Sequence, residues 1–193
     1  MTTVMQATQN AVELDIINSA LLTLGADPIA ALTENTAQGR LCANFWPVSV
    51  AAVLRLHPWN FAIKRDVLTP DPDAPPYEWK SAFTFPSDLL RLLDLDEVKE
   101  YKVEGRKILC DETTLNIRYV YRNVSVDEWD ALFIEAMTAY MAFKLAYPIT
   151  KSNTTKNDMW GLFTEVLRTA KAIDAQEEPG ETLGDFPFLN VRG

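Results

Sequence analysis

The stretch Leu54-Arg55-Leu56-His57-Pro58-Trp59-Asn60-Phe61-Ala62 marks a change in the pattern of the sequence. On its N-terminal side, apolar residues recur every three or four positions, as they do on one face of a helix. On its C-terminal side, short runs rich in Val, Ile, Phe and Tyr are separated by Pro and Gly, which is typical of strands joined by turns. The stretch is therefore expected to connect a helical part of the chain to a β part.

Two helices are expected before this stretch. The first covers residues 11–24, where Asn10 and Glu13 have the spacing of a capping box and Gly25 has the usual position after a helix end. The second covers about residues 35–56. Its apolar face is predicted to carry Leu41, Phe45, Val48 and Ala52.

Pro47 lies inside the second expected helix. Proline has no amide hydrogen to donate and crowds the preceding turn. We therefore expect either a kink near residues 43–46 or two shorter helices.

After the stretch, strands are expected at residues 62–68, 81–85, 90–95, 100–103, 107–110 and 115–122. Gly105 is predicted to form the turn of a hairpin, because it separates two short strand-like runs. Residues 70–76 are dense in proline, which cannot donate to a central ladder, so they are expected to form an exposed loop.

Helical spacing returns after Val124, where Ser125 and Glu128 are spaced as a capping box and Val124 with Trp129 as a hydrophobic staple. This third helix is apolar around most of its circumference, so it should be buried on several sides until Pro148 ends it.

A fourth helix, residues 154–176, should pack antiparallel to the third, because the connection is short. The side chains expected to face inward are Met159, Phe163, Val166, Leu167, Ala170 and Ile173.

These elements predict an α+β fold. Residues 1–60 and 124–176 are expected to form a four-helix bundle-like domain, with residues 61–123 as an inserted antiparallel β region. Residues 177–193 are expected to be an extended C-terminal tail.

The tail carries apolar residues without any periodicity, so they cannot build a core of their own. We expect them to dock on a neighbouring subunit or a partner ring, the alternative being a frayed terminus. The predicted interface residues are Phe186, Phe188, Leu189, Val191 and, on the fourth helix, Trp160.

The charge of the chain bears on its partners. Twenty-seven acidic residues against 18 basic ones give a formal charge of −9, which repels polyanions and disfavours sequence-specific binding of nucleic acid. Such acidity suits a conduit through which DNA slides, because contacts between basic residues and phosphate would slow its passage. Simple solubility explains the charge equally well.

Cellular location follows from what the sequence lacks. Cys42 and Cys110 are not expected to meet, which favours a reduced cytosolic origin. No secretory signal and no run of about 20 apolar residues is present, so a soluble chain made in the cytoplasm, without a membrane anchor, is expected.

The sequence gives little support for catalysis. His57 is the single histidine, which excludes sites with two imidazoles. It could act as a base beside a Ser or Cys, although a structural role at the helix-to-strand junction is favoured. Neither cysteine has the spacing of zinc ligands, and no glycine-rich phosphate loop occurs, so no metal or cofactor is expected. The five tryptophans are not interleaved with a run of basic residues, and Trp129 is flanked by Glu128 and Asp130, so they are assigned to core and interface packing.

Three stretches resemble the tail tubular protein A family, the head-to-tail adaptors of short-tailed bacteriophages. The first reaches from Ile17-Asn18-Ser19-Ala20-Leu21 to the H-P-W-N-F-A segment at 57–62. The second joins Phe85-Pro86-Ser87-Asp88-Leu89-Leu90-Arg91 to the E-G-R hairpin at 104–106 and the last expected strand. The third runs from Trp129-Asp130-Ala131-Leu132-Phe133 to Pro148-Ile149-Thr150.

The resemblance covers about residues 12–176. It implies a structural virion protein that forms a twelve-subunit ring between the portal protein and the tail nozzle or tube, with genomic DNA passing through. It implies no enzymatic activity and no cofactor. Trp46-Pro47 departs from the tyrosine-rich helix of the family.

Two other functions stay open at this stage. Paired carboxylates could make the chain a peptidoglycan-degrading tail component, although 27 acidic residues always supply some pair. A stopper or connector of a long-tailed phage would share a helical-bundle design.

Overall fold

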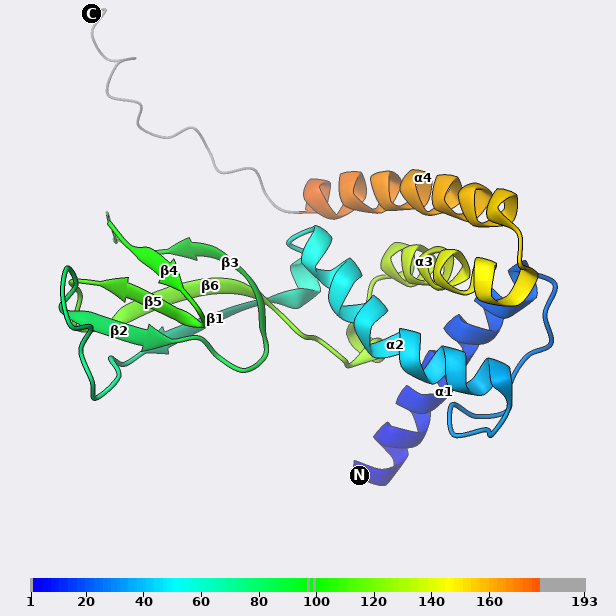
Figure 1. Cartoon of the computed structure of the whole chain (residues 1–193), viewed down its shortest axis with the longest axis horizontal. Coiled ribbons are helices and arrows are strands. Elements are labelled where there is room, and N and C mark those ends of the chain that lie inside the picture. Colours follow the sequence, from blue (N-terminus) through cyan, green and yellow to red (C-terminus); the bar gives the residue numbers. More distant parts are fainter. Residues whose placement is uncertain (1, 97, 99, 178–193) are drawn as a thin grey trace, which may run out of the picture.

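The computed structural model describes residues 2–96, 98 and 100–177. Four helices lie to one side and six short strands to the other (Figure 1). The helices are α1 (Thr2–Thr23), α2 (Ala37–Leu56), α3 (Ala131–Thr150) and α4 (Asn153–Glu177). The α+β class predicted from the sequence is confirmed.

The strands form two three-stranded antiparallel sheets. One has the order β1 (Ile63–Leu68), β6 (Leu115–Tyr121), β3 (Leu89–Leu95), and the other β2 (Ser81–Thr84), β5 (Lys107–Cys110), β4 (Lys102–Glu104). Every strand begins and ends within two residues of its predicted bounds. The β4–β5 hairpin turns at Gly105, whose φ of +59° suits glycine. Residues 70–76 contain no strand, as expected.

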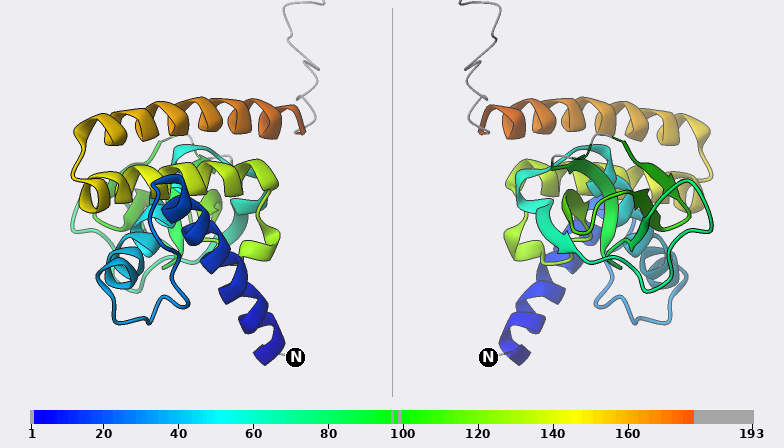
Figure 2. Two further views of the ribbon diagram at one scale, coloured as in Figure 1. Left: turned by 90° about the vertical axis from the view of Figure 1, so that its right-hand side faces the viewer. Right: turned by 90° about the vertical axis from the view of Figure 1, so that its left-hand side faces the viewer.

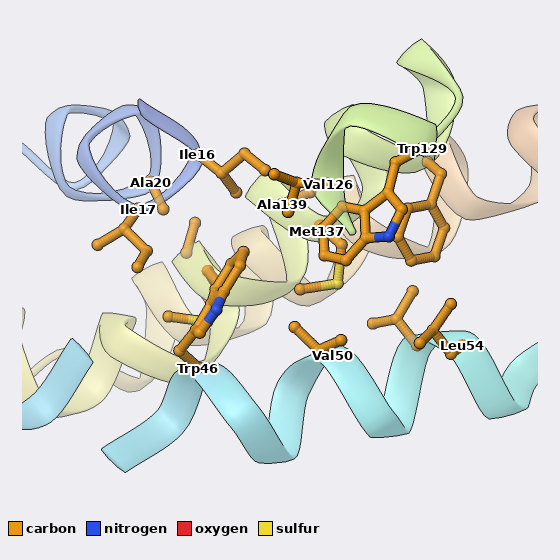
Figure 3. Packing of buried hydrophobic residues seen from close by; sticks show 14 of the residues in the cluster. Ile16, Ile17, Ala20, Trp46, Val50, Leu54, Val126, Trp129, Met137 and Ala139 are labelled. Atoms are coloured by element: carbon orange, nitrogen blue, oxygen red, sulfur yellow. The ribbon is translucent and has the colours of Figure 1, made fainter. Parts of the chain in front are cut away.

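Helix α3 lies between α4 on one side and α1 and α2 on the other (Figure 2). Its buried residues lie around its circumference, which confirms the expected burial on several sides. Figure 3 shows Trp46 and Val50 of α2 pointing toward Ile16 of α1 and Met137 of α3. Helices α1, α2 and α4 therefore each bury apolar area against α3. This burial stabilises the fold by roughly 25 cal/mol for each Å² removed from water.

A second core lies between the two sheets. Phe83 and Ile108 from one sheet meet Ile117 and Tyr119 from the other, and all four side chains are at most 3% exposed. The next residue, Val120, points to the opposite face of β6 and joins the helical core. This alternation follows from strand geometry, in which successive side chains lie on opposite faces.

The capping box predicted at Asn10 is wrong, because α1 already begins at Thr2 and Asn10 lies inside it. Residues 2–10 contain no Gly or Pro that would interrupt the helical hydrogen bonds. The predicted helix end is confirmed. Gly25 has a φ of +70° and donates to the Leu22 carbonyl at 2.9 Å, while Ala26 donates to the Leu21 carbonyl at 3.0 Å.

Helix α2 continues through Pro47 as one helix, so the alternative of two shorter helices is wrong and the kink stays a prediction. The carbonyl that loses its partner belongs to Ala43, an exposed residue whose carbonyl water can satisfy. The predicted apolar face is also wrong in part, since Val48 is 55% exposed. The buried positions are Gly39, Cys42, Trp46, Ser49, Val50, Val53 and Leu54.

Helix α3 begins at Ala131, later than predicted. Ser125 precedes a separate 3₁₀ turn, Val126–Glu128, without a side-chain capping bond, and the Glu128 carboxylate accepts from Asn123 Nδ2 at 2.8 Å. The capping residue is Asp130, whose Oδ1 accepts from the Leu132 amide at 2.8 Å.

The prediction that Pro148 ends α3 is wrong, because the helix reaches Thr150. Its last turn still closes, with the Lys151 amide donating to the Tyr147 carbonyl at 3.0 Å. Lys151 then takes the left-handed conformation that terminates helices.

Helix α4 turns back along α3 after two residues, as predicted. Phe163 and Ala170 are buried and Met159, Val166 and Leu167 are half-buried, but Ile173 is 40% exposed, so its inward assignment is wrong. The buried position near the end of α4 belongs instead to Asp174.

Candidate functional site

An aromatic surface lies where α4 packs on α3. We define it by Tyr140, Phe143, Trp160 and Phe163. The Trp160 ring lies 4.9 Å from that of Phe143 and 5.6 Å from that of Phe163, and Tyr140 lies 4.8 Å from Phe163. Phe163 is 1% exposed, whereas Trp160 is 47% exposed. The surface therefore has a buried base and an open rim.

Helical spacing explains this gradient. Trp160 precedes Phe163 by three residues, so the two share one side of α4 while Trp160 lies nearer its edge. Lys156, four residues before Trp160, holds its ammonium 5.6 Å from the centre of the Phe143 ring. A half-exposed tryptophan on a preformed aromatic base is the kind of anchor that protein interfaces use.

Of the five interface residues predicted from the sequence, the structure places Trp160 alone. Phe186, Phe188, Leu189 and Val191 lie outside the described residues. Their assignment stays a prediction.

A polar junction, defined by His57, Asn60 and Asp174, ties the end of α2 to the end of α4. His57 Nε2 lies 3.0 Å from Asp174 Oδ2, and the Asn60 amide donates to Asp174 Oδ1 at 3.2 Å. Asn60 Nδ2 also donates to the Asp174 carbonyl oxygen at 2.9 Å. Asp174 is 8% exposed, so these bonds replace water that its carboxylate has lost.

Burial lowers the pKa of His57, and the Asp174 carboxylate offsets part of this effect. Lys171 and Arg91 lower the pKa further through their positive charges. A neutral imidazole must carry its proton on Nε2, because the Asp174 carboxylate can only accept.

No described Ser, Thr or Cys side chain hydrogen-bonds to His57. The imidazole ring of His57 instead packs edge-on against the Trp59 ring, with 4.9 Å between the ring centroids. The geometry supports the structural role favoured for His57 in the sequence.

Asp88 organises the turn before β3. Its Oδ1 accepts from the Tyr119 hydroxyl at 3.1 Å, and its Oδ2 lies 2.9 Å from Lys64 Nζ. Burial alone would raise its pKa, but the bonds from Lys64 and Tyr119 hold the pKa below its ordinary value. Asp88 belongs to one of the motifs that carry the family resemblance.

A groove of about 660 Å³ crosses the sheet β1-β6-β3. It is lined by Arg65, Asp66, Val67, Asp94, Asp96, Asn116, Ile117 and Arg118. Arg65 lies directly opposite Arg118 in the ladder. The polar residues at alternate positions 116 and 118 of β6 are the sequence signal that would have revealed this open part of the sheet.

The described residues hold no group of three or more His, Cys, Asp and Glu side chains suited to a metal ion. Cys42 lies in the helical core and Cys110 in the β core, so they do not pair. Burial raises the pKa of the Cys42 thiol to about 11. Within the same residues, no helix has the length and apolar character that crossing a membrane requires.

Comparison with models of known protein families finds no match, and comparison with curated proteins finds no significant match.

Proposed function

We propose that this chain is a structural head-to-tail adaptor of a tailed bacteriophage. In this proposal copies of the chain form a ring, of twelve subunits if it follows the family, between the portal protein and the tail nozzle or tube. Genomic DNA passes through the ring without sequence-specific binding, and the protein acts in the virion and not as an enzyme.

The observation that carries the proposal is the position of the H-P-W-N-F-A segment. Within it His57 and Asn60 bind Asp174, and the Trp59 Nε1 donates to the Val53 carbonyl at 3.2 Å. The most specific stretch of the family resemblance thus lies where α2, α4 and the first strand meet. Asp88, from the second stretch, fixes the turn before β3.

A closed ring of identical subunits needs two different complementary surfaces on each chain. The aromatic surface on α3 and α4 and the charged groove on β1, β6 and β3 are two unlike surfaces, each of which can contact a matching surface of a neighbouring subunit or of a partner ring. They belong to the two different parts of the chain seen in Figure 1. The bundle-like grouping of four helices around α3 and the docking of residues 186–191 on a neighbour or partner ring are parts of the same proposal.

Native mass measurement of the chain, alone and mixed with portal particles, tests the proposal. We expect monomers or weak associations alone and a discrete ring-sized oligomer on the portal after mixing. Absence of any complex with portal particles, or absence of the chain from purified virions, would contradict it. Turnover of peptidoglycan in a zymogram would favour a lytic component instead.

A further inference from the structure

Three basic side chains gather where α2, β3 and α4 meet. We call Arg55, Arg91 and Lys171 the basic cluster. The Arg55 guanidinium donates to the Leu90 carbonyl, and Arg91 Nη1 donates to the Arg55 carbonyl at 3.2 Å. Lys171 lies one turn before Asp174 on the same side of α4, which is the side held against the end of α2.

The basic cluster has no acidic partner in the described part of the chain. None of the ion pairs formed there includes Arg55, Arg91 or Lys171. The nearby carboxylate of Asp174 is already occupied by His57 and the Asn60 amide. Guanidinium and ammonium groups pair most favourably with carboxylate or phosphate, so the cluster is prepared for an anion.

The pKa of Lys171 agrees with this lack of an acidic partner in the described residues. Its side chain is half-buried, and burial followed by the charge of Arg91 lowers its pKa. A carboxylate beside it would favour the charged ammonium and reverse that shift.

The sequence after α4 contains carboxylates that can reach the basic cluster. Asp174 is held at the polar junction, and α4 ends three residues later at Glu177. The following segment, Glu178-Pro179-Gly180-Glu181-Thr182-Leu183-Gly184-Asp185, contains three acidic residues and no basic one. Eight residues can span at most about 27 Å, and α4 rises only about 9 Å from residue 171 to 177, so the segment can reach back to the cluster.

We propose that the acidic segment 178–185 binds the basic cluster of its own chain. Nucleic acid is the weaker candidate, because a chain with a formal charge of −9 repels a free polyanion, whereas the acidic segment is covalently tethered close to the cluster. The proposal concerns the isolated chain and stands whether or not the chain is an adaptor.

The first test compares the pKa of Lys171, followed by NMR of its side chain, in full-length variants. The test variant carries Glu178→Gln, Glu181→Gln and Asp185→Asn. The control carries Asp73→Asn, Glu100→Gln and Glu135→Gln, which make the same change in charge at exposed residues without an ion pair in the described part. We expect a lower Lys171 pKa in the test variant than in the control and the parent chain. Equal values in all three would overturn the proposal.

The second test places a spin label on Gly184→Cys. The native thiols are buried, so the label attaches to the new cysteine. We expect broadening of the Arg91 and Lys171 amide signals when label and isotope are on one chain, and its loss at high salt. Broadening confined to mixtures of labelled and isotope-enriched chains would identify a second copy as the occupant and overturn the proposal. Absence of broadening, with a DNA duplex shifting these signals instead, would assign the cluster to nucleic acid.

Discussion

His57 and Asp174 lie 117 positions apart in the chain, yet His57 Nε2 and Asp174 Oδ2 are 3.0 Å apart in a half-buried hydrogen bond. This hydrogen bond joins the end of α2 to the end of α4. It also brings the start of the β part next to the place where the C-terminal segment begins.

Replacing Asp174 by Ala should destabilise the fold by about 2 kcal/mol, because the half-buried His57 and the Asn60 amide would both lose the carboxylate that accepts their hydrogen bonds. Urea unfolding at pH 7.5 measures the change. Asp158→Ala, at an exposed position on the same helix, is the control and should stay within about 0.5 kcal/mol of the parent. A similar effect of both substitutions would show that the junction contributes nothing specific.

Stability should decline as the pH falls below the ordinary histidine pKa of 6.5. The folded chain holds the pKa of His57 below that value, so the unfolded chain takes up the proton first and unfolding becomes easier. Well above pH 6.5, where His57 is neutral in both the folded and the unfolded chain, the stability that His57 contributes is fully present. Urea unfolding between pH 7.5 and 5.5 should show a shallower dependence in His57→Gln, and an unchanged slope would contradict the assignment.

Both thiols should resist modification in the folded protein. Burial raises the pKa of Cys42 to about 11, and the Cys110 thiol is shifted in the same direction by burial, so little thiolate is present at pH 8. A colourimetric thiol assay should detect both cysteines only after unfolding. Thr69→Cys, at an exposed position, supplies a reactive control. Rapid reaction of the native parent chain would refute the prediction.

Trp160→Ala should weaken assembly on the portal about 30-fold, which corresponds to about 2 kcal/mol for an aromatic anchor at an interface. Circular dichroism should show a retained fold, since Phe163 still fills the space beneath. Tyr77→Ala, which truncates a 72% exposed ring in the loop before β2, should assemble normally. Equal assembly of the two variants would remove Trp160 from the proposed interface.

Ending the chain after Glu178 should abolish incorporation into the ring and leave the monomer folded. The deleted part contains Phe186, Phe188, Leu189 and Val191, and the described residues form both cores without it. Thermal unfolding tests whether the shortened chain stays folded, and sedimentation with portal particles tests whether it is incorporated. Normal incorporation would show that these apolar residues are not the docking element.

Local patterns predicted the elements well, and their failures have a common cause. Gly25, the strand bounds and the central burial of α3 follow from spacing that a short window contains. Asn10 and Ser125 also had the spacing of caps, yet neither caps a helix, because many segments offer that pattern and neighbouring structure selects among them.

The site was harder to predict because its contacts join distant positions. Nothing near Asp174 marks it as a buried carboxylate, and the periodicity of α4 favoured Ile173 for that place. Its partner His57 was identified as structural from its position alone. Trp160 was predicted to be an interface residue, which stays a prediction, and its stacking on Phe143 depends on the packing of two helices.

The placement of Tyr119 and Val120 in different cores has a mechanical meaning. One peptide bond of β6 joins a residue locked between the sheets to a residue locked against the helices. A force applied to the strands, such as the pull of a partner during assembly, would reach the helices through that bond without a flexible joint between them. We therefore expect β6 to couple movements of the sheets to movements of the helices.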